Sequence, residues 1–413
     1  MKLLLLTSST GGGHDMRARS FERWAASPAA AHLGIVTARH QALEDGGSRL
    51  YAFGAWLYNF IQRVRPALHH IYFNVLEIVP FCGRAGAMPG RAAFEELVRR
   101  EVPDIVLSTH DHLNHAFLEA ARLALPARPP LVGTYCGELA GGYGFSKHWV
   151  NPRADFFIGA VDACVAEARR LGMPAEKSWT GGFMLDPDFY QWPVASGQWS
   201  VDGGQWSVDG GQWPVDGGQK AEARRFTLLL GTGANGANNH IALLDAFARF
   251  HAADATASTG SAAGAIHSPR LIALCGRNDA ARRAVEAWAA AHPQFAVEAL
   301  AYRDDMRAVM SRCDAIFARP GTGTTSEAIQ CGLPVLFNGI GGVMPQEIIT
   351  LRHCRRHFET HVVRRPRDLP PLVAAWAGDP ARLAQVRAGV ASARPAGTPL
   401  QILERLAALA AAR

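Results

Sequence analysis

The feature that most constrains the fold of this sequence is a regular alternation of short apolar runs with longer segments of helical character. In the first half, apolar runs of strand length occupy residues 2–8, 33–38, 104–109, 130–136 and 155–160. In the second half, such runs occupy residues 226–233, 270–276, 295–300, 314–321 and 333–338. Strands that alternate with helices favour a parallel sheet covered on both faces. The sequence therefore predicts an α/β fold of two doubly wound, Rossmann-like domains that face a cleft, the default place for a ligand.

The two halves meet at an irregular segment, which sets the predicted domain boundaries. We expect an N-terminal domain over 1–185, a linker over 186–224, a C-terminal domain over 225–380 and terminal helices over 381–413 that pack back on the first domain. Within the linker, GQWSVDG occurs twice and GQWPVDG once, between residues 197 and 217. Units of seven residues are too short for a solenoid, so a duplication in a tolerant loop is favoured over a tryptophan-bearing binding segment.

Composition and charge describe a chain with ample core-forming material and a mild excess of positive charge. Hydrophobic residues make up 48% of the 413 residues, and the formal net charge is +6. This charge suits an anionic partner such as a nucleotide or a membrane surface, and no interleaved basic and aromatic motif indicates nucleic acid. No apolar run approaches the roughly 20 residues of a membrane span, and the leucines at 3–6 are too few for a signal-peptide core. We therefore expect a cytoplasmic protein without an integral anchor.

A glycine-rich loop, TSSTGGGHDM at residues 7–16, follows the first apolar run. It matches neither the G-x-G-x-x-G pattern nor the P-loop, although Gly12 and Gly13 allow the backbone to approach a ligand closely. His14 falls in the first turn of the next predicted helix, where the helix dipole disfavours a cationic ring and lowers the pKa of the imidazole. A neutral imidazole that faces a cleft is a competent general base; the alternative is a surface or capping histidine.

The most specific constellation is ARPGTGTTSEAIQCGLPVLFN, at residues 318–338. A strand is predicted to end at Arg319, and a turn rich in glycine and threonine precedes a helix that holds Glu327 in its first turn. Free amide groups at a helix N-terminus, together with threonine hydroxyls, form an anion site suited to phosphate. Glu327 is placed to accept from the vicinal hydroxyls of a ribose, and its alternative role is to complement the helix dipole. The expected phosphate-binding residues are Gly321, Thr322, Gly323, Thr324 and Thr325.

Three further loops follow predicted strands of the second half, at the ends where α/β sheets bind ligands. The first loop could approach a pyrophosphate, and the second could pair with phosphate or a base edge. The glutamine and glutamate of the third could bind the hydroxyls of a sugar, or they could be helix-start residues without a ligand. In chain order, these residues are Gly231, Thr232 and Gly233, then Arg277 and Asn278, then Gln346 and Glu347.

Residues 49–81 are unusually aromatic and carry apolar side chains at helical spacing. Tyr51, Trp56 and Tyr58 lie off this stripe, and arginines flank it. An amphipathic segment with aromatic and arginine side chains suits the interface of an anionic bilayer. The alternative is a helical pair packed over the first sheet, because apolar stripes usually face a core. The stripe comprises Leu50, Phe53, Leu57, Phe60, Ile61 and Val64.

The distribution of histidine and cysteine does not favour a metal site. The segment HDHLNH at 110–115 holds three histidines, yet it lacks H-E-x-x-H spacing, and no other ligand cluster stands out. The seven cysteines form no C-x-x-C pair, and most have apolar neighbours. They are typical of buried thiols in a reducing compartment rather than of disulfides or zinc ligands.

In chain order, the glycine loop, CGRND at 275–279, the constellation at 318–338 and PQE at 345–347 resemble the GT-B glycosyltransferases of the monogalactosyldiacylglycerol synthase type, in glycosyltransferase family 28. They are similar, more distantly, to the enzyme that adds N-acetylglucosamine to the undecaprenyl-linked peptidoglycan precursor. The resemblance implies inverting transfer of a hexose or N-acetylhexosamine from a UDP-sugar to a membrane lipid, diacylglycerol-like or another glycolipid. It also implies that no metal or other cofactor is needed, and that the protein is peripheral on the inner face of the membrane.

The resemblance also implies roles for particular residues. It makes His14 the general base that acts on the acceptor hydroxyl. It places the 320–325 turn on the diphosphate of the donor, Glu327 on the ribose, and the Gln346–Glu347 pair on the sugar. The chain departs from the family where it has MPQE for PGQE and RPGTGT for KAGPGT.

Two residues are expected on the acceptor side, Glu138 from the same resemblance and His110 from its place in the sequence. Where many relatives have Thr-Asp in the fourth strand region, this chain has CGEL, and we expect Glu138 to orient the acceptor or assist His14. We expect His110, at the end of a predicted strand, to line the acceptor cleft. Two other functions stay open, namely a UDP-sugar epimerase or hydrolase of the same fold, and a non-catalytic membrane protein that binds nucleotide-sugars.

Overall fold

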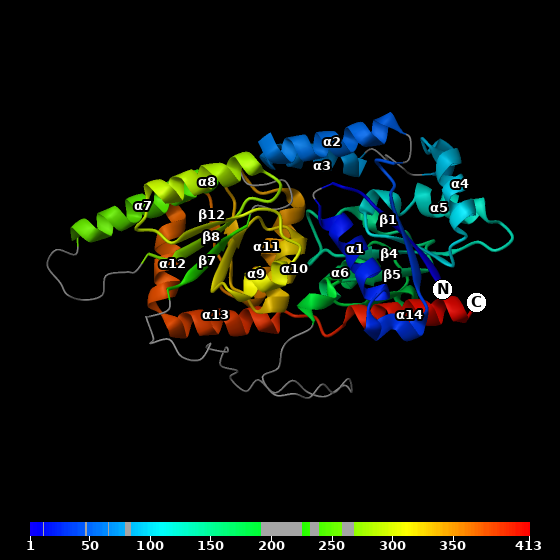
Figure 1. Cartoon of the computed structure of the whole chain (residues 1–413). Coiled ribbons are helices and arrows are strands. Elements are labelled where there is room, and N and C mark those ends of the chain that lie inside the picture. The colour runs from blue at the N-terminus through cyan, green and yellow to red at the C-terminus, as the bar shows by residue number, and fades with distance from the viewer. Residues whose placement is uncertain are drawn as a thin grey trace.

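The computed structural model describes residues 1–10, 12–45, 48–64, 66–78, 84–190, 225–231, 239–257 and 268–413. The tryptophan repeat, Thr232, Gly233 and Cys82 lie outside the described residues. Within them the chain forms two α/β domains, side by side in Figure 1, each built on one six-stranded parallel sheet. The predicted fold of two Rossmann-like domains is confirmed.

The first sheet has the strand order β2-β1-β3-β4-β5-β6. Its order reverses between β1 and β3, so the loops that leave these two strands diverge and open a crevice at their carboxyl ends. The four leucines at 3–6 are buried because β1 lies inside the sheet with helices on both faces. The strands are β1 (Lys2–Thr7), β2 (Val36–Gln41), β3 (Ile105–Ser108), β4 (Leu131–Cys136), β5 (Phe156–Gly159) and β6 (Ser178–Thr180).

The helices of the first domain fall into two groups. One group covers the sheet, namely α1 (Gly13–Ala25), α4 (Arg91–Glu101), α5 (Ala116–Ala124) and α6 (Asp162–Arg170). The other group is the pair α2 (Arg49–Val64) and α3 (His69–Ile78), joined through a short 3-10 helix that starts at Pro66. In Figure 1 this pair lies along the top of the molecule, and α3 contacts α11 of the second domain.

The second sheet has the strand order β12-β11-β10-β7-β8-β9, which reverses between β7 and β10. Its strands are β7 (Thr227–Leu230), β8 (Arg270–Leu274), β9 (Val297–Leu300), β10 (Ala315–Ala318), β11 (Val335–Asn338) and β12 (Val362–Val363). Its helices are α7 (His240–Ala257), α8 (Asp279–Ala291), α9 (Met306–Ser311), α10 (Thr322–Cys331), α11 (Pro345–His357), α12 (Leu369–Gly378) and α13 (Pro380–Ser392).

The last helix, α14 (Pro399–Ala411), returns to the first domain. It packs against α1 and the 3-10 helix Pro28–Leu33, and Figure 1 shows it beside them near both chain ends. Its start is well defined because Thr398 and Gln401 form a capping box around Pro399. The preceding helix α13 instead contacts α10, α11 and α12. Of the segment 381–413, therefore, only α14 lies on the first domain.

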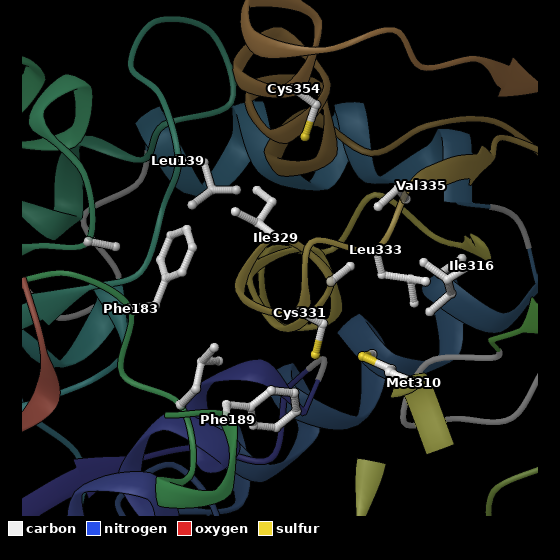
Figure 2. Close-up of a cluster of buried hydrophobic side chains, with 14 of the residues drawn as sticks. Leu139, Phe183, Phe189, Met310, Ile316, Ile329, Cys331, Leu333, Val335 and Cys354 are labelled. Atoms are coloured by element: carbon white, nitrogen blue, oxygen red, sulfur yellow. The ribbon is translucent and has the colours of Figure 1, made fainter. Parts of the chain in front are cut away.

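The two domains share one hydrophobic core. Figure 2 shows Leu139, Phe183 and Phe189 of the first domain around α10, close to Ile329 and Cys331 of the second. These side chains belong to a single cluster of buried residues that extends into both sheets. The interface is therefore packed like an interior rather than formed by a few surface contacts.

The strands follow the predicted apolar runs, with differences that have simple causes. The run at 33–38 was placed too early, since β2 begins at Val36, after a 3-10 helix that ends at Leu33. Strands β6 and β12 were not predicted because they have only three and two residues. The six described cysteines are free and buried, as expected. No helix among the described residues is both long and apolar enough to cross a bilayer.

Candidate functional site

His14 lies at the crevice of the first sheet, on the first turn of α1. Gly12, the residue before that helix, has φ 76°, a left-handed conformation that suits glycine and turns the chain sharply from β1 into α1. The His14 Nδ1 atom lies 2.7 Å from the carbonyl oxygen of Thr109, which follows β3. A carbonyl oxygen can only accept, so Nδ1 carries the proton and Nε2 keeps its lone pair. The side chain is thereby fixed as a proton acceptor.

The surroundings of His14 keep its ring neutral. Burial, together with His110 and Arg17, lowers the pKa of His14 to about 3. The predicted direction of the shift is therefore found, although burial and not the helix dipole is the main cause. The ring of His110 lies 4.3 Å from that of His14, measured between centroids. A second imidazole this close opposes protonation of His14.

A cavity of about 110 Å³ opens between these histidines and the helical pair α2–α3. Its floor is polar and its walls are largely aromatic, a combination typical of small-molecule sites. None of the described residues that line it is a lysine or an arginine. The polar floor comprises Thr10, His14, His110, Asp111, His112 and Glu138, and the aromatic walls comprise Tyr51, Tyr58, Tyr72, Phe73 and Trp149.

His110 lines the cavity, and so does the next residue, Asp111, a charged member of the HDHLNH segment. The Oδ1 atom of Asp111 lies 3.0 Å from His110 Nδ1. Burial by itself raises the pKa of Asp111, but His112 and His110 outweigh it and hold that pKa well below its usual range. No group of three or more potential metal ligands was found among the described residues. Asp111 therefore supplies a negative charge close to His14.

Glu138 belongs to the polar floor of the cavity and lies just beyond the end of β4. Its Oε2 atom is buried and has no hydrogen-bond partner among the described residues. Burial raises the pKa of Glu138 to about 7, against a lowering effect of Arg17 and with a further raising effect of Asp111. A carboxyl with one unsatisfied oxygen in a cavity is available to bind a polar ligand atom.

The phosphate-binding turn predicted at 320–325 is the N-terminus of α10, at the crevice of the second sheet. Gly321 is the residue before the helix, and Thr322 is its first residue. Glu327 is therefore in the second turn and not in the first, which corrects the prediction, because the threonines form the first turn themselves. Burial, with a contribution from Asp186, raises the pKa of Glu327 to about 8. The amides of the first turn have no partner within the helix and remain free to bind an anion.

The glycine loop of the first domain and the N-terminus of α10 lie against each other. A Cβ atom on Gly323 would lie 3.1 Å from the Met16 side chain and 4.0 Å from the Gly13 Cα atom. The side chain of Arg17 spans the same junction, and its Nη2 atom donates to Thr322 Oγ1 at 2.5 Å and to the Gly137 carbonyl at 3.2 Å. Arg17 was not predicted from the sequence. The available signal was its position one helical turn after His14.

Gln346 and Glu347 lie at the start of α11 and differ in their contacts. Gln346 lines the cavity and donates through Nε2 to the Tyr58 hydroxyl at 2.7 Å. Glu347 is buried, pairs with Arg319, and accepts from the Met344 amide at 2.8 Å in a capping box. The Gln346 side chain is thus exposed to a ligand in the cavity, whereas the Glu347 carboxylate is occupied by protein groups.

The remaining predicted residues lie at the carboxyl ends of β7 and β8. Gly231 donates from its amide to the Phe317 carbonyl at 2.8 Å, which fixes it beside β10. Arg277 stacks on the ring of Tyr302, with 4.6 Å between its guanidinium carbon and the ring centroid. Asn278 caps α8 through its side-chain oxygen, which accepts from the Ala281 amide at 3.0 Å. These loops therefore surround the same end of the second sheet as α10.

Comparison with known sequences gives one partial match. No protein-family model matches the chain. Monogalactosyldiacylglycerol synthase 3, chloroplastic, of Arabidopsis thaliana is 29% identical over 109 residues, which are 26% of this chain and 22% of that protein. The match thus spans only about a fifth of the length of that relative.

Comparison with solved structures extends over the whole chain. MurG of Acinetobacter baumannii matches with a TM-score of 0.53 and 13% identity, over 100% of this chain and 99% of its own. MnaA of S. aureus, solved with UDP, matches with a TM-score of 0.53 and 12% identity, over 99% and 96%. HepE of Anabaena, in complex with UDP, matches with a TM-score of 0.51 and 12% identity, over 100% of both chains. These likenesses show the GT-B fold.

Proposed function

We propose that this protein is a glycosyltransferase that moves a sugar from a UDP-sugar to a hydroxyl group of a membrane lipid. The observation that carries the proposal is the orientation of His14. Its Nδ1 atom donates its proton to the Thr109 carbonyl. The Nε2 atom of this cavity-lining residue is therefore left without a proton and can accept one. The N-terminus of α10 lies directly beside the same loop. The proposed base for the acceptor and the proposed anion site for the leaving group would therefore be adjacent.

The donor half of the proposal rests on the second domain. The free amides of the first turn of α10 would hold the diphosphate of a UDP-sugar, and Glu327 would accept from the ribose hydroxyls. Gln346 reaches the cavity from this domain and would contact the transferred hexose or N-acetylhexosamine. MnaA and HepE, which share the fold, were solved with UDP, and this supports a uridine nucleotide as the donor carrier.

The acceptor half of the proposal rests on the cavity. Its aromatic walls and the absence of lysine and arginine among its described lining residues suit an uncharged, hydroxyl-bearing head group. The name of the partly matching relative, a monogalactosyldiacylglycerol synthase, supports a lipid of the diacylglycerol or glycolipid type. The acceptor hydroxyl would donate to His14 Nε2, and Glu138 would accept from a second hydroxyl or steady the developing imidazolium.

The reaction would be a single displacement with inversion. The acceptor oxygen forms the new bond to the anomeric carbon while its proton passes to His14 Nε2 and the bond to UDP breaks. The ionised Asp111 carboxylate, which acts electrostatically on His14, would stabilise the positive charge that this histidine gains. The helix N-terminus stabilises the negative charge that the departing diphosphate gains, so this chain's own groups address both charges without a metal.

The helical pair α2–α3 supplies the proposed membrane surface. Leu50, Phe53, Trp56 and Phe60 of α2 are each 45% to 56% exposed, although all four are large and apolar. Exposed apolar side chains gathered on one helix mark a surface that binds another apolar phase. The opposite face of the pair lines the cavity. A lipid held at the outer face is then about one helix diameter, roughly 10 Å, from the cavity. Such a protein would be peripheral on the inner face of an anionic membrane.

Sugar transfer can be tested directly with the purified protein. Radiolabelled UDP-galactose, UDP-glucose and UDP-N-acetylglucosamine are each incubated with vesicles that contain diacylglycerol, and the products are identified by chromatography and mass spectrometry. We expect one labelled glycolipid. His14→Ala should lower the transfer rate by about 10²- to 10⁴-fold, as for loss of a general base, and should leave the affinity for UDP unchanged.

A matched control is His32→Ala, because His32 is exposed on the 3-10 helix Pro28–Leu33. This variant should transfer sugar at the rate of the wild type. Unchanged turnover in His14→Ala would sink the assignment of the base. Release of free sugar without a glycolipid would point to a hydrolase, conversion of the UDP-sugar to an epimerase, and binding without turnover to a non-catalytic protein.

A further inference from the structure

Arg17 is a buried cation that forms no ion pair among the residues that the structure describes. The residue is 4% exposed. The nearby Asp15 on the same helix pairs with Arg19 and Arg39 instead. The Arg17 Nη2 atom donates to two neutral oxygens, Thr322 Oγ1 and the Gly137 carbonyl. Burial of a charge is costly unless the charge is paired, so a lone buried guanidinium is an unusual feature of a folded domain.

The place of Arg17 increases this cost. Thr322 is the first residue of α10, so the guanidinium points at the N-terminus of that helix. A helix N-terminus carries a partial positive charge, and its first amides have no partner within the helix. Two positive features from different domains therefore face each other. Among the described residues no carboxylate forms an ion pair with the guanidinium, and Glu138, whose pKa Arg17 lowers, leaves its Oε2 atom without a hydrogen-bond partner. An anion at this junction would satisfy both positive features.

We propose that Arg17 binds the diphosphate of the donor from the side of the first domain and stabilises the charge of the departing UDP. This inference rests on the proposed donor site and adds to it a residue outside the domain that holds α10. A planar guanidinium can donate two parallel hydrogen bonds to phosphate oxygens, which suits this role better than a lysine ammonium.

The assignment gives α1 two tasks. His14 and Arg17 are one helical turn apart, so the helix that carries the proton acceptor also carries the cation for the leaving group. Because the first domain packs against α10 through the shared core, Arg17 lies at the N-terminus of α10 in this structure and needs no further movement to reach an anion there.

Equilibrium binding measures this role without turnover. Isothermal titration of the full chain with UDP, uridine and inorganic pyrophosphate compares wild type, Arg17→Gln, Arg17→Lys and Arg19→Gln. We expect Arg17→Gln to lower the affinity for UDP and for pyrophosphate by about 10- to 100-fold, as for a lost hydrogen bond to a charged group. The affinity for uridine, which has no phosphate, should be unchanged. Arg17→Lys, which keeps the charge without the planar fork, should lie between wild type and Arg17→Gln.

Arg19 provides the matched control, because it lies on the same helix and pairs at the surface with Asp15 at 2.6 Å. Arg19→Gln should bind all three ligands like the wild type. If Arg17→Gln does not fold, Arg17→Lys alone tests the proposal through its loss of UDP affinity with uridine unchanged.

The outcomes separate this inference from the proposed function. Equal UDP affinity in wild type and the Arg17 variants overturns the role of Arg17 and leaves the donor site standing. An equal loss of uridine binding also overturns it, since the effect would then be structural. If pyrophosphate binds in an Arg17-dependent way but UDP does not bind, the role of Arg17 in binding a diphosphate is supported and a UDP-sugar as the donor is contradicted. A wild type that binds neither ligand overturns both proposals.

Discussion

At the scale of single residues, the cavity holds two carboxyl groups whose environments act in opposite directions. Asp111 lies beside His110 and His112, and these neighbours hold its pKa well below the usual range despite burial. Glu138 is buried with one unsatisfied oxygen, and burial raises its pKa to about 7. Divergent pKa values in one site are typical of groups with different chemical tasks. Asp111 is suited to stabilise charge, and Glu138 to exchange a proton or bind a hydroxyl.

The raised pKa of Glu138 predicts a change in stability with pH. In the unfolded chain the carboxyl ionises above about 4.5, whereas in the folded protein it keeps its proton up to about 7. Its contribution to the free energy of unfolding therefore falls as pH rises from 4.5 to 7, and the full loss, about 3 kcal/mol, is reached at pH 8. Glu138→Gln stays neutral, so urea titrations should find it more stable than wild type by up to this amount at pH 8.

The same comparison at pH 4 should show little difference, because wild-type Glu138 is protonated there in both states. Glu96→Gln, at an exposed position of α4, is the control and should show no difference between variant and wild type that grows with pH. A gain for Glu138→Gln that is equal at pH 4 and pH 8 would show that the ionisation of Glu138 does not cause it.

At the scale of elements, the pair α2–α3 has two apolar faces with different uses. Tyr51, Ala55 and Tyr58 of α2 line the cavity, and Tyr58 also accepts a hydrogen bond from Gln346. On the opposite side, the rings of Phe53, Trp56 and Phe60 form an exposed ladder, with centroids 5.7 Å and 5.3 Å apart. The sequence offered two alternatives for this helix, a membrane-binding segment and a helical pair packed over the sheet. Neither describes it fully, because one face lines the cavity and the other stays exposed.

This exposed ladder predicts membrane binding that can be weakened without unfolding the protein. The double change Phe53→Ser and Trp56→Ser removes two aromatic side chains that are already in solvent. Binding to vesicles of phosphatidylglycerol and a neutral lipid, measured by flotation, should fall by about 10- to 100-fold. Full burial of one large apolar side chain contributes roughly 1.5–3 kcal/mol, and these two side chains, 56% and 53% exposed, have about half of their area left to bury.

The control for this change is Leu123→Ser, at an exposed apolar position of α5. Leu123→Ser should float like the wild type. The double variant and the control variant should both have the melting temperature of the wild type in solution. If the double variant floated as well as the wild type, the membrane surface would have to lie elsewhere on the molecule.

At the scale of the whole molecule, the two domains are joined by packing and not only by the connecting chain. The core cluster runs from the first sheet through α10 into the second sheet, and α14 returns to the first domain at the end of the chain. Figure 2 shows the central place of Ile329 in this arrangement. Such a shared core couples the unfolding of one domain to that of the other.

Shortening Ile329 tests this coupling. Ile329→Ala should lower the free energy of unfolding by about 2–4 kcal/mol, because it leaves a cavity at a fully buried position. Calorimetry should show one transition in both wild type and variant, with the whole transition moved to lower temperature. Ile71→Ala is the matched control, since Ile71 is 66% exposed, and it should melt like the wild type. Two separate transitions, only one of them shifted, would contradict a shared core.

Much of the fold and part of the site could be predicted from local patterns. The apolar runs located most strands because strand length and burial are recorded in consecutive residues, and two strands too short to leave such a record were missed. Gly12 and His14 were found because a glycine turn between a strand and a helix is a local feature. The start of α10 was placed too late because its first turn is made of threonines, which are also typical of loops.

The sequence by itself therefore determined the two parallel sheets, the loops at their carboxyl ends and the chemical groups on those loops. Only the tertiary structure decided which groups meet. Arg17 reaches Thr322 across 305 positions of the chain, and Tyr58 reaches Gln346 across 288. It also decided that Glu347 is paired with Arg319 while Gln346 lines the cavity. The physical reason is that periodicity and spacing record local backbone geometry and average burial, whereas contacts between domains arise from the packing of the whole chain.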